Sequence, residues 1–439
     1  MASSSRTTRR KFLGQAGAGA AAALAVPYFV PARVLGAQGA TPPSDRVVMG
    51  IIGTGGMGKA NLNAFMSEPE VQVVAVCDVD AGHVQGAADM ANENYGNKDC
   101  QKFSDFRKLL EVDGLDAVAV VTPDHWHALA SIAALKAGKD VYCEKPLANS
   151  VGEGRAMCNA VKETGRILQC GSHERSNPKV REACEFVRNG RLGKIKAVHI
   201  MLPCDEAHHN AVRALKDVPP TGPVPEGFDY NFWLGHTPEV PYNEKRCHFF
   251  WRFNLTYGGG EMTDRGAHII DVGQLALGMD DTGPVSYTAK GVPATGLYNA
   301  FFDFTFENNY ANGVRMIGTS VPGPRGIKFE GENGTLMVNI HGGEYSAEPA
   351  SLITKAVKDG EVQLGRAANH RRNFLDCVKS REQPFATSEI DHRAATICHL
   401  NNIAMRLGRP FNWDPVKELT DDDEANKLLM PSMRAPWTL

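Results

Sequence analysis

The sequence lacks the features that mark several common classes of protein. Its charge is nearly balanced, with 47 Lys and Arg against 50 Asp and Glu and a formal net charge of −3. No basic patch is interleaved with aromatic residues, so we expect no nucleic-acid partner. There is also no internal repeat and no long low-complexity tract, which argues against a solenoid or a fibrous protein.

The ten cysteines show no metal or disulfide pattern. There is no C-x-x-C, and Cys77 and Cys143 each end an apolar run, as small buried side chains do. Residues 204–209 (CDEAHH) offer ligand types, but no second half with ligand spacing follows, only Cys247-His248. We therefore expect neither a disulfide framework nor a metal site.

Residues 1–40 are predicted to be a twin-arginine signal peptide. Arg9-Arg10 precedes an Ala/Gly-rich stretch that runs to about Val26, and small residues at 35–40 offer a cleavage site. The apolar run is too short and too rich in small residues to span a bilayer. The alternatives are a disordered basic tail and a membrane anchor. We expect export by the twin-arginine translocase to the periplasm, a route that moves folded proteins.

A chain of 439 residues is long for one domain and suggests two. We place a nucleotide-binding domain at 45–172, a second domain at 173–425 and a C-terminal tail at 426–439.

The first domain opens on a glycine-rich turn. The apolar run Val47–Ile52 ends in Gly53-x-Gly55-x-x-Gly58, followed by a helix-like segment. In a dinucleotide-binding turn the first glycine allows the bend, the second lets the backbone approach the pyrophosphate, and the third lets helix and strand pack closely. The alternative is a plain glycine turn. The residues expected to contact the pyrophosphate are Gly53, Thr54, Gly55, Gly56, Met57 and Gly58.

Strand-like and helix-like segments alternate through the rest of this domain. Apolar runs at 71–77, 116–121, 140–143 and 166–170 are separated by helical patterns at 81–95, 105–111, 125–137 and 151–164. This alternation predicts a doubly wound parallel sheet, the Rossmann fold, whose ligands bind beyond the carboxyl ends of the strands.

Asp78 follows the second apolar run and lies twenty residues after Gly58. A carboxylate there can accept hydrogen bonds from the ribose hydroxyls and would repel a 2′-phosphate. We therefore expect NAD rather than NADP. The alternative is a solvated aspartate at a strand end.

Three further motifs resemble the glucose–fructose oxidoreductase/inositol dehydrogenase (Gfo/Idh/MocA) family. They are Thr122-Pro123-x-x-x-His127, Glu144-Lys145-Pro146 and the glycine-rich Asp264-x-x-x-His268 segment. The resemblance runs from about residue 46 to about 409. It implies a Rossmann domain followed by a domain with a large, open, mainly antiparallel sheet, through which members form dimers or tetramers. It also implies a cofactor site that includes Thr122, Pro123, His127, Glu144, Lys145 and Pro146.

The catalytic set implied by the resemblance is Lys145, Asp264 and His268. Oxidation of a carbinol needs a base, and a lysine with a lowered pKa or a histidine can serve. Which of the two is the base stays open, and Asp264 could orient the imidazole. On one helix, Asp264 and His268 would share a face. The alternatives are a surface lysine and a core histidine.

The substrate is expected to contact side chains near this set and in a long irregular segment, 203–255, which is rich in Pro, His and aromatics. Ordinary packing is the alternative for the aromatic residues. The candidates are His125, Trp126, Arg175, Trp251 and Arg265.

The second domain shows a second set of strand-like runs, at 194–202, 284–292, 298–306, 313–320, 326–330 and 335–338, with helical patterns at 177–188, 367–380 and 388–406. Glu332-Asn333-Gly334 indicates a tight hairpin. Antiparallel sheets often leave one face for another subunit, so we expect a homo-oligomer.

Together these features predict an exported NAD(P)-dependent oxidoreductase that moves hydride between a nicotinamide cofactor and a sugar, polyol or glycoside. A tightly bound cofactor, reoxidised by a second carbonyl substrate, would suit a compartment without free nucleotide. One alternative is an NAD-dependent retaining glycosidase, although such relatives depart from the Glu-Lys-Pro triplet that this chain keeps. The other is a non-catalytic cofactor-bearing protein.

Overall fold

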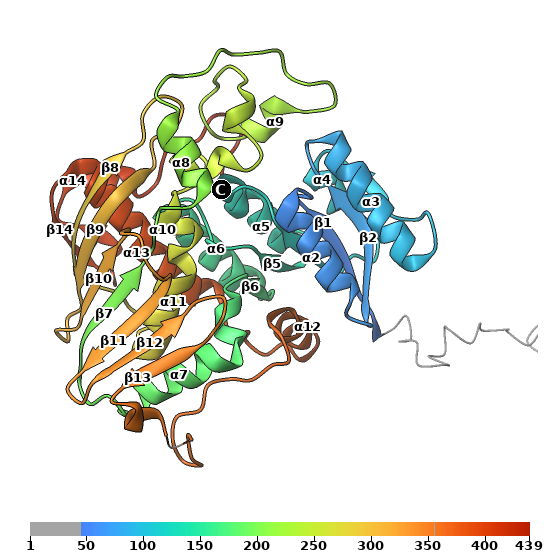
Figure 1. The fold of residues 1–439 in the computed structure, drawn as a ribbon. Coiled ribbons are helices and arrows are strands. Elements are labelled where there is room, and N and C mark those ends of the chain that lie inside the picture. Colours follow the sequence, from blue (N-terminus) through green and yellow to red (C-terminus); the bar gives the residue numbers. More distant parts are fainter. Residues whose placement is uncertain (1–44, 355) are drawn as a thin grey trace, which may run out of the picture. The chain divides into compact units, whose positions relative to one another are not determined.

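The computed structural model describes residues 45–354 and 356–439, and residues from Val47 onward form one unit (Figure 1). The signal peptide predicted over residues 1–40 lies outside this range. Within the described part, no helix has the length and apolar character needed to cross a membrane.

The first sheet is a six-stranded parallel sheet in the order β3-β2-β1-β4-β5-β6. The order reverses between β1 and β4, where such sheets bind their ligands. The prediction of a doubly wound sheet is confirmed. The strands are β1 (Val47–Ile52), β2 (Val71–Cys77), β3 (Gln101–Phe103), β4 (Ala117–Val120), β5 (Asp140–Cys143) and β6 (Leu168–Cys170).

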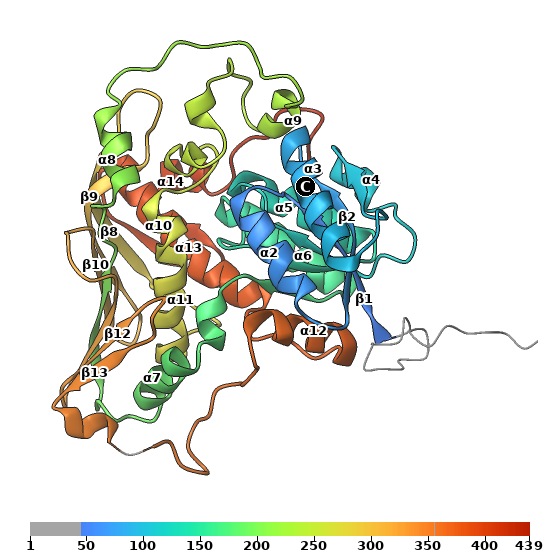
Figure 2. The same ribbon diagram turned by 45° about the vertical axis from the view of Figure 1, so that its right-hand side comes forward.

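Helices cover both faces of this sheet, with a separate hydrophobic cluster on each. They are α2 (Gly56–Met66), α3 (Ala81–Tyr95), α4 (Phe106–Leu109), α5 (His127–Lys136) and α6 (Val151–Thr164). A further helix, α12 (His370–Ser380), comes from far along the chain (Figure 2). Its Phe374 is fully buried and contacts the rings of Phe65 and Tyr142, so the first domain borrows part of its core from the second.

The second sheet has nine strands in the order β13-β12-β11-β7-β10-β9-β8-β14-β15, and only β7 and β10 pair in parallel. The predicted large, mainly antiparallel sheet is therefore confirmed. The strands are β7 (Ile195–Met201), β8 (Ser286–Pro293), β9 (Phe301–Asn309), β10 (Arg315–Thr319), β11 (Gly326–Gly331), β12 (Thr335–Asn339), β13 (Tyr345–Glu348), β14 (Phe411–Asp414) and β15 (Leu419–Thr420).

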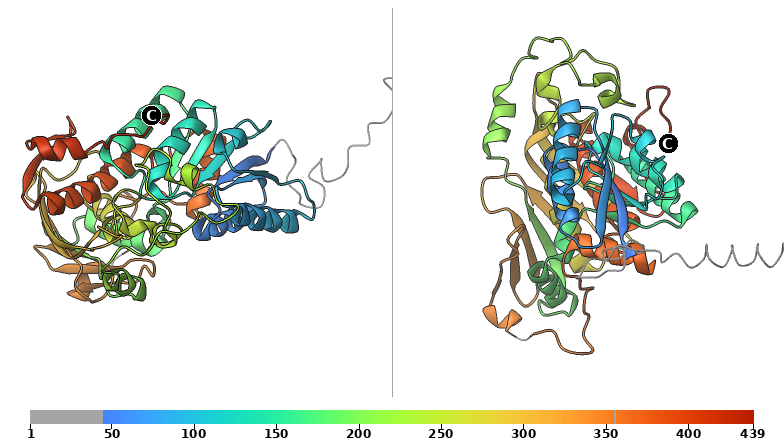
Figure 3. Two further views of the ribbon diagram at one scale, coloured as in Figure 1. Left: turned by 90° about the horizontal axis from the view of Figure 1, so that it is seen from above. Right: turned by 90° about the vertical axis from the view of Figure 1, so that its right-hand side faces the viewer.

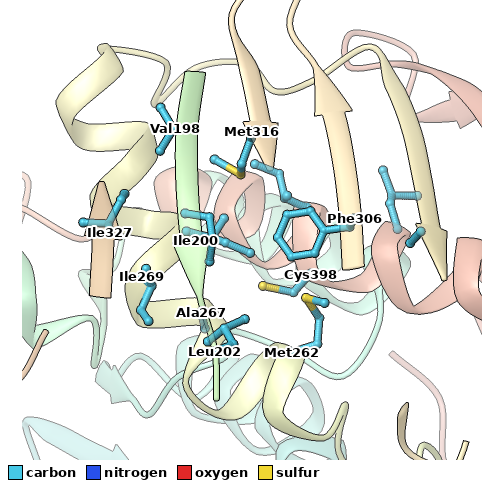
Figure 4. Close-up of a cluster of buried hydrophobic side chains, with 14 of the residues drawn as sticks. Val198, Ile200, Leu202, Met262, Ala267, Ile269, Phe306, Met316, Ile327 and Cys398 are labelled. Carbon is cyan, nitrogen blue, oxygen red and sulfur yellow. The ribbon is translucent and has the colours of Figure 1, made fainter. Parts of the chain in front are cut away.

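Helices α7 (Pro178–Arg188), α11 (Gly266–Leu277) and α13 (Ser388–Leu407) lie between this sheet and the Rossmann domain, which stand on opposite sides when seen from above (Figure 3). α13 contacts both α6 of the first domain and β8 of the sheet. The core beneath the sheet joins strand residues such as Val198 and Phe306 to helix residues such as Ile269 and Cys398 (Figure 4).

The opposite face of the nine-stranded sheet carries polar side chains along β9. Along β9, Phe302, Phe304 and Phe306 are buried, whereas Asp303 and Thr305, which alternate with them, are exposed. The alternation follows from the two-residue period of a strand.

Segment 203–255, predicted to be irregular, contains two short helices, α8 (Ala207–Ala214) and α9 (Tyr230–Leu234). The residues that cap these helices lie in a Pro-rich stretch and were not recognised in the sequence. Glu206 and His209 form a capping box at α8, and Asp229 accepts from the Phe232 N–H at α9. Each helix is too short for the apolar periodicity of a helix to show in the sequence.

Residues 215–234, which we name the strap, run from the second domain onto the first (Figures 1 and 2). Phe228 forms a β-bridge with Asp80. The Ala81 N–H donates to the Gly227 carbonyl at 2.9 Å, and the Asp229 N–H donates to the Val79 carbonyl at 2.9 Å. The strap is therefore fastened beside Asp78, at the end of β2.

The C-terminal residues pack against the molecule, although a tail was expected at 426–439. Helix α14 (Asp423–Leu428) runs across the expected boundary, and Leu429 is buried. The Trp437 ring contacts the rings of Trp126 and Phe232, and this apolar contact anchors the segment.

Candidate active site at the carboxyl edge of the Rossmann sheet

The glycine turn is built as a dinucleotide needs. Gly53 has φ +87°, and a Cβ there would lie 2.5 Å from the Val121 carbonyl oxygen. A Cβ on Gly58 would lie 2.1 Å from the Gly53 carbonyl oxygen. By contrast, a Cβ on Gly55 would meet only His83, at 3.9 Å, and one on Gly56 would meet nothing within 4 Å. The turn is thus tightly packed on the side of Gly53 and Gly58 and open on the side of Gly55 and Gly56.

Helix α2 begins in this turn with its N-terminal N–H groups available. No side chain caps the helix, and its first turn holds no acidic residue. Free N–H groups and the positive end of the helix dipole favour an anion. The turn therefore fits a pyrophosphate.

Asp78 lies next to the turn and is positioned by backbone donors. Its Oδ2 accepts from the Thr54 N–H at 2.7 Å, and its Oδ1 accepts from the Asp80 N–H at 3.0 Å. Burial alone would raise the pKa of Asp78, but the His83 side chain and these two N–H groups outweigh it and lower the pKa. The carboxylate is therefore ionised and can accept from ribose hydroxyls.

Lys145 and Asp264 meet across the boundary between the domains. The Lys145 Nζ donates to the Asp264 backbone carbonyl at 2.6 Å and to its Oδ1 at 2.8 Å. Arg252 and Arg265 approach the same carboxylate, each at 3.5 Å. Burial would raise the pKa of Asp264, but Lys145 and Arg252 outweigh it and hold the pKa far below its usual range. Two of the three ammonium donors are thus directed at Asp264, which leaves one for another oxygen.

The spacing of Asp264 and His268 suggested one shared helix, but the structure places them on two helices. Helix α10 (Glu261–Asp264) ends at Asp264, and α11 begins at Gly266. The Asp264 carbonyl accepts from the Lys145 ammonium at this break. The Asp264 carboxylate is occupied by Lys145, so it pairs with the lysine and not with the imidazole.

His268 is buried in the first turn of α11, 5% exposed, and its Nδ1 has no hydrogen-bond partner among the described residues. Its ring centroid lies 4.7 Å from that of His173 and 5.2 Å from that of His341. Burial, followed by the positive charges of Lys145 and His173, lowers the pKa of His268 well below 6.5. The imidazole is therefore neutral at physiological pH and can accept a proton.

Two residues of this site were missed in the sequence. Asp124 is buried close enough to Lys145, Arg252 and Asp264 for their charges to act on it, and burial raises its pKa well above the usual value. Its place in the strand-end turn after Thr122-Pro123 was the available signal. Arg252 stacks on the rings of Trp251 and Phe249, and nothing in the sequence separated it from other loop arginines.

His127 and Glu144 tie together the segments that frame the site. The His127 ring nitrogens lie 2.7 Å from the Pro146 carbonyl oxygen and 3.0 Å from that of Thr122. Glu144 accepts from the Asn61 side-chain amide at 2.9 Å and so joins the end of β5 to α2. These contacts fix the positions of the two strand-end loops relative to each other and to α2.

Three of the five substrate candidates are buried and have polar contacts within the protein. His125 and Trp126 are buried, and each places a ring nitrogen 2.9 Å from the Trp233 carbonyl oxygen. Arg175 is 4% exposed and is neutralised by Asp271 and Asp280. A buried guanidinium needs such partners, and the Nε, Nη1 and Nη2 of Arg175 all donate to these two aspartates.

The other two candidates lie nearer the site. Trp251 is 8% exposed and packs on Gly258, where a Cβ would come within 2.7 Å of its ring. Arg265 is partly exposed and contacts Glu261 at 3.0 Å and Glu206 at 3.2 Å, besides Asp264. Of the five, Arg265 alone contacts the catalytic set in the described structure.

The two ends of the glycine motif give a direct test. Gly58→Ala places a methyl group against backbone that cannot retreat, so we expect it to lower thermal stability and NAD affinity together. Gly55→Ala meets open space and is the matched control for stability. It should keep the melting temperature and lose NAD affinity about 10-fold or more, because its methyl group projects where the pyrophosphate binds. Calorimetric titration with NAD and thermal melting measure both; unchanged affinity in Gly55→Ala would contradict the assignment of the turn.

Comparison with known proteins agrees with this geometry. The family model described as "Oxidoreductase family, NAD-binding Rossmann fold" matches residues 47–172, and that described as "Oxidoreductase family, C-terminal alpha/beta domain" matches residues 177–439.

Curated relatives match only part of this chain. An inositol 2-dehydrogenase of Rubrobacter xylanophilus is 34% identical over 152 residues, which cover 34% of this chain and 42% of the relative. A levoglucosan dehydrogenase of Pseudarthrobacter phenanthrenivorans is 33% identical over 151 residues, which cover 34% of this chain and 38% of the relative. The match thus spans about two fifths of each relative's length.

A solved structure shares the fold over nearly its whole length. A levoglucosan dehydrogenase in complex with NADH and levoglucosan superposes with a TM-score of 0.60 at 20% identity, covering 84% of this chain and 99% of that one. The two family models together leave little of the described chain unmatched. This protein therefore belongs to the Gfo/Idh/MocA oxidoreductase family.

Proposed function

We propose that this protein is an exported, NAD-dependent oxidoreductase that acts on a carbinol of a sugar, polyol or glycoside. The observation that carries the proposal is the meeting of Lys145, Asp264 and a neutral His268 at the carboxyl edge of the Rossmann sheet. The open glycine turn and an ionised Asp78 supply the features that NAD requires at the same edge.

NAD, when bound, supplies the hydride acceptor. Lys145 directs its remaining donor at the substrate oxygen and stabilises the negative charge that develops there. Asp264 fixes the ammonium by two contacts. His268 takes the hydroxyl proton, because its lowered pKa leaves it neutral. We thus assign the base to His268 and the electrostatic role to Lys145.

The substrate class rests on the relatives. Their names state action on inositol and levoglucosan, and the solved neighbour is a complex with NADH and levoglucosan. Polyhydroxylated rings of this kind suit a site where Lys145 and Arg265 offer hydrogen-bond donors beside Asp264.

A substrate panel tests the proposal against its two alternatives. Purified protein is mixed with NAD and a panel of sugars, polyols and aryl glycosides. Reduction of NAD by a sugar or polyol is the expected result, whereas release of the aryl group without net NADH would indicate a glycosidase. Binding of NAD with neither reaction would indicate a non-catalytic protein.

Lys145→Ala should lower kcat by about 10²–10³-fold, because one charge-stabilising donor is lost. Lys108→Ala, at an exposed surface pair, is the control and should keep full activity.

The pH profile tests the base. A base must be neutral, so a lowered pKa moves the acid limb of kcat/KM well below pH 6.5, and activity falls only as His268 becomes protonated. His268→Asn should lower kcat by about 10²–10⁴-fold and abolish that limb. His199→Asn, at a partly exposed strand position, should leave the profile unchanged. If the acid limb persists in the His268 variant, the protonation that causes it belongs to a group other than His268.

The strap supports the proposal of a tightly held cofactor. Its contacts with Val79, Asp80 and Ala81 follow Asp78 directly, at the end of the sheet where the adenosine would bind. The ring centroids of His248, just beyond the strap, and His83 lie 5.6 Å apart. A covered adenosine end would slow release of NAD, as suits a protein loaded with its cofactor before export.

Ala81→Pro tests the strap with little other change. Ala81 is the first residue of α3, where proline is tolerated, and the substitution removes the N–H that donates to Gly227. Loss of one hydrogen bond, about 1 kcal/mol, should speed NAD dissociation by about 5-fold. Asp423→Pro, at the first residue of α14, is the matched control and should not change the rate. Stopped-flow release of NAD measures both, and equal rates would show that the strap does not retain the cofactor.

We also propose that the polar face of the nine-stranded sheet forms a homo-oligomer interface. Helices α7, α11 and α13 occupy the other face. Strand β9, which carries Asp303 and Thr305, belongs to a broad surface free of these helices (Figure 2).

A further inference from the structure

Three groups of side chains in the described structure bring histidine and carboxylate ligand atoms within 4.8 Å of one another. None was predicted from the sequence, since each joins residues from separate segments. The groups are Asp80, His83 and His248; His173, Glu174 and His341; and His208, His209 and Glu261.

The second group, which we name the 173/174/341 cluster, contains a buried carboxylate with no permanent cation. Glu174 is 1% exposed. Its Oε1 lies 3.0 Å from the His341 Nδ1 and 3.5 Å from the His173 Nε2, and it accepts from the His341 N–H at 3.0 Å. Its Oε2 accepts from the Asn177 amide at 3.1 Å. No lysine or arginine pairs with it within the ranges described.

A carboxylate removed from water needs a compensating positive charge. Arg175 and Asp271 show how this protein meets that need elsewhere, with a buried guanidinium against buried carboxylates. At Glu174 the contacting side chains are two imidazoles and an amide, and imidazoles are the commonest metal ligands in proteins.

In the other two groups the carboxylates already have arginine or backbone N–H partners. The His209 Nδ1 accepts from the Glu206 N–H, so its Nε2 carries the proton that points at Glu261. Arg265 and Arg325 also neutralise Glu261 and Glu206. The arginines thus supply the positive charge that an ion would otherwise provide.

In the first group, Asp80 is the N-cap of α3, and its Oδ1 accepts from the N–H groups of Gly82 and His83. The His83 ring is directed at Asp78, with its Nδ1 3.7 Å from the carboxylate. Both residues therefore have structural partners, and the 173/174/341 cluster is the one with an unmet charge.

We propose that His173, Glu174 and His341 bind a divalent transition-metal ion of the Mn²⁺ to Zn²⁺ series. Two imidazoles and one carboxylate form a common donor set for such ions, which leaves further positions open to water or another ligand. His173 and His341 are 49% and 40% exposed, so an ion can reach the cluster from solvent. The site does not depend on the proposed reaction.

The ion would lie beside the candidate active site. The His268 ring is 4.7 Å from that of His173 and 5.2 Å from that of His341, measured between centroids. His268 is not assigned as a ligand, because no hydrogen bond or ion pair joins it to Glu174 in the described structure.

Metal titration of the full-length protein, stripped with a chelator, tests the site. We expect one equivalent of Zn²⁺ by calorimetry, and visible absorption bands when Co²⁺ is used as the probe. Loss of a supporting group around a metal costs about 10–100-fold in affinity, so loss of a ligand should cost about 100-fold or more. The variants are Glu174→Gln, His173→Asn and His341→Asn. Asparagine suits position 341, because His341 has φ +72°, a conformation that asparagine tolerates.

His208→Asn and His83→Asn are the matched controls, since each removes one histidine from a competing group. Both should keep the stoichiometry and affinity of the parent protein. His173 is half-exposed, so its variant should fold normally, as circular dichroism and thermal melting would show. The proposal is overturned if the parent protein takes up no ion, if the His173 and His341 variants bind as it does, or if binding is lost in a control instead.

Discussion

The contact between Lys145 and Asp264 is the constraint on which the site depends. It joins the end of β5 in the Rossmann domain to the break between α10 and α11, and it uses both the carboxylate and the backbone carbonyl of Asp264. Two arginines share the carboxylate, so its charge is strongly stabilised in a partly buried setting. The same contact leaves His268 without an acid partner. The contact thus fixes the ammonium of Lys145, whose positive charge adds to the effect of burial in lowering the pKa of His268.

The fold could be predicted from the sequence because its signals are local. The apolar runs that end at Ile52, Cys77 and Cys143 form parallel strands in the structure. The turn predicted from the glycine spacing lies where the strand order reverses. The resemblance to one family supplied the large sheet. Contacts with distant partners could not be predicted: the sequence does not show that Arg175 pairs with Asp271 and Asp280.

The catalytic set shows the same limit at closer range. The structure brings Lys145 and Asp264 into contact, but the spacing of four residues between Asp264 and His268 could not reveal the interruption at Arg265. That interruption coincides with a lysine contact from 119 residues away. The cluster of His173, Glu174 and His341 could not be predicted from the sequence either, because His341 follows Glu174 by 167 residues.

The packing of α12 onto the Rossmann domain bears on the order in which the molecule can be assembled during synthesis. Phe65 and Tyr142 are made early, but the ring that covers them, Phe374, emerges only near the end of translation. Until then the nascent first domain exposes an apolar face and lacks part of its core. Folding of the two domains is therefore not sequential, and the chain completes its nucleotide-binding half only after nearly all of it has left the ribosome.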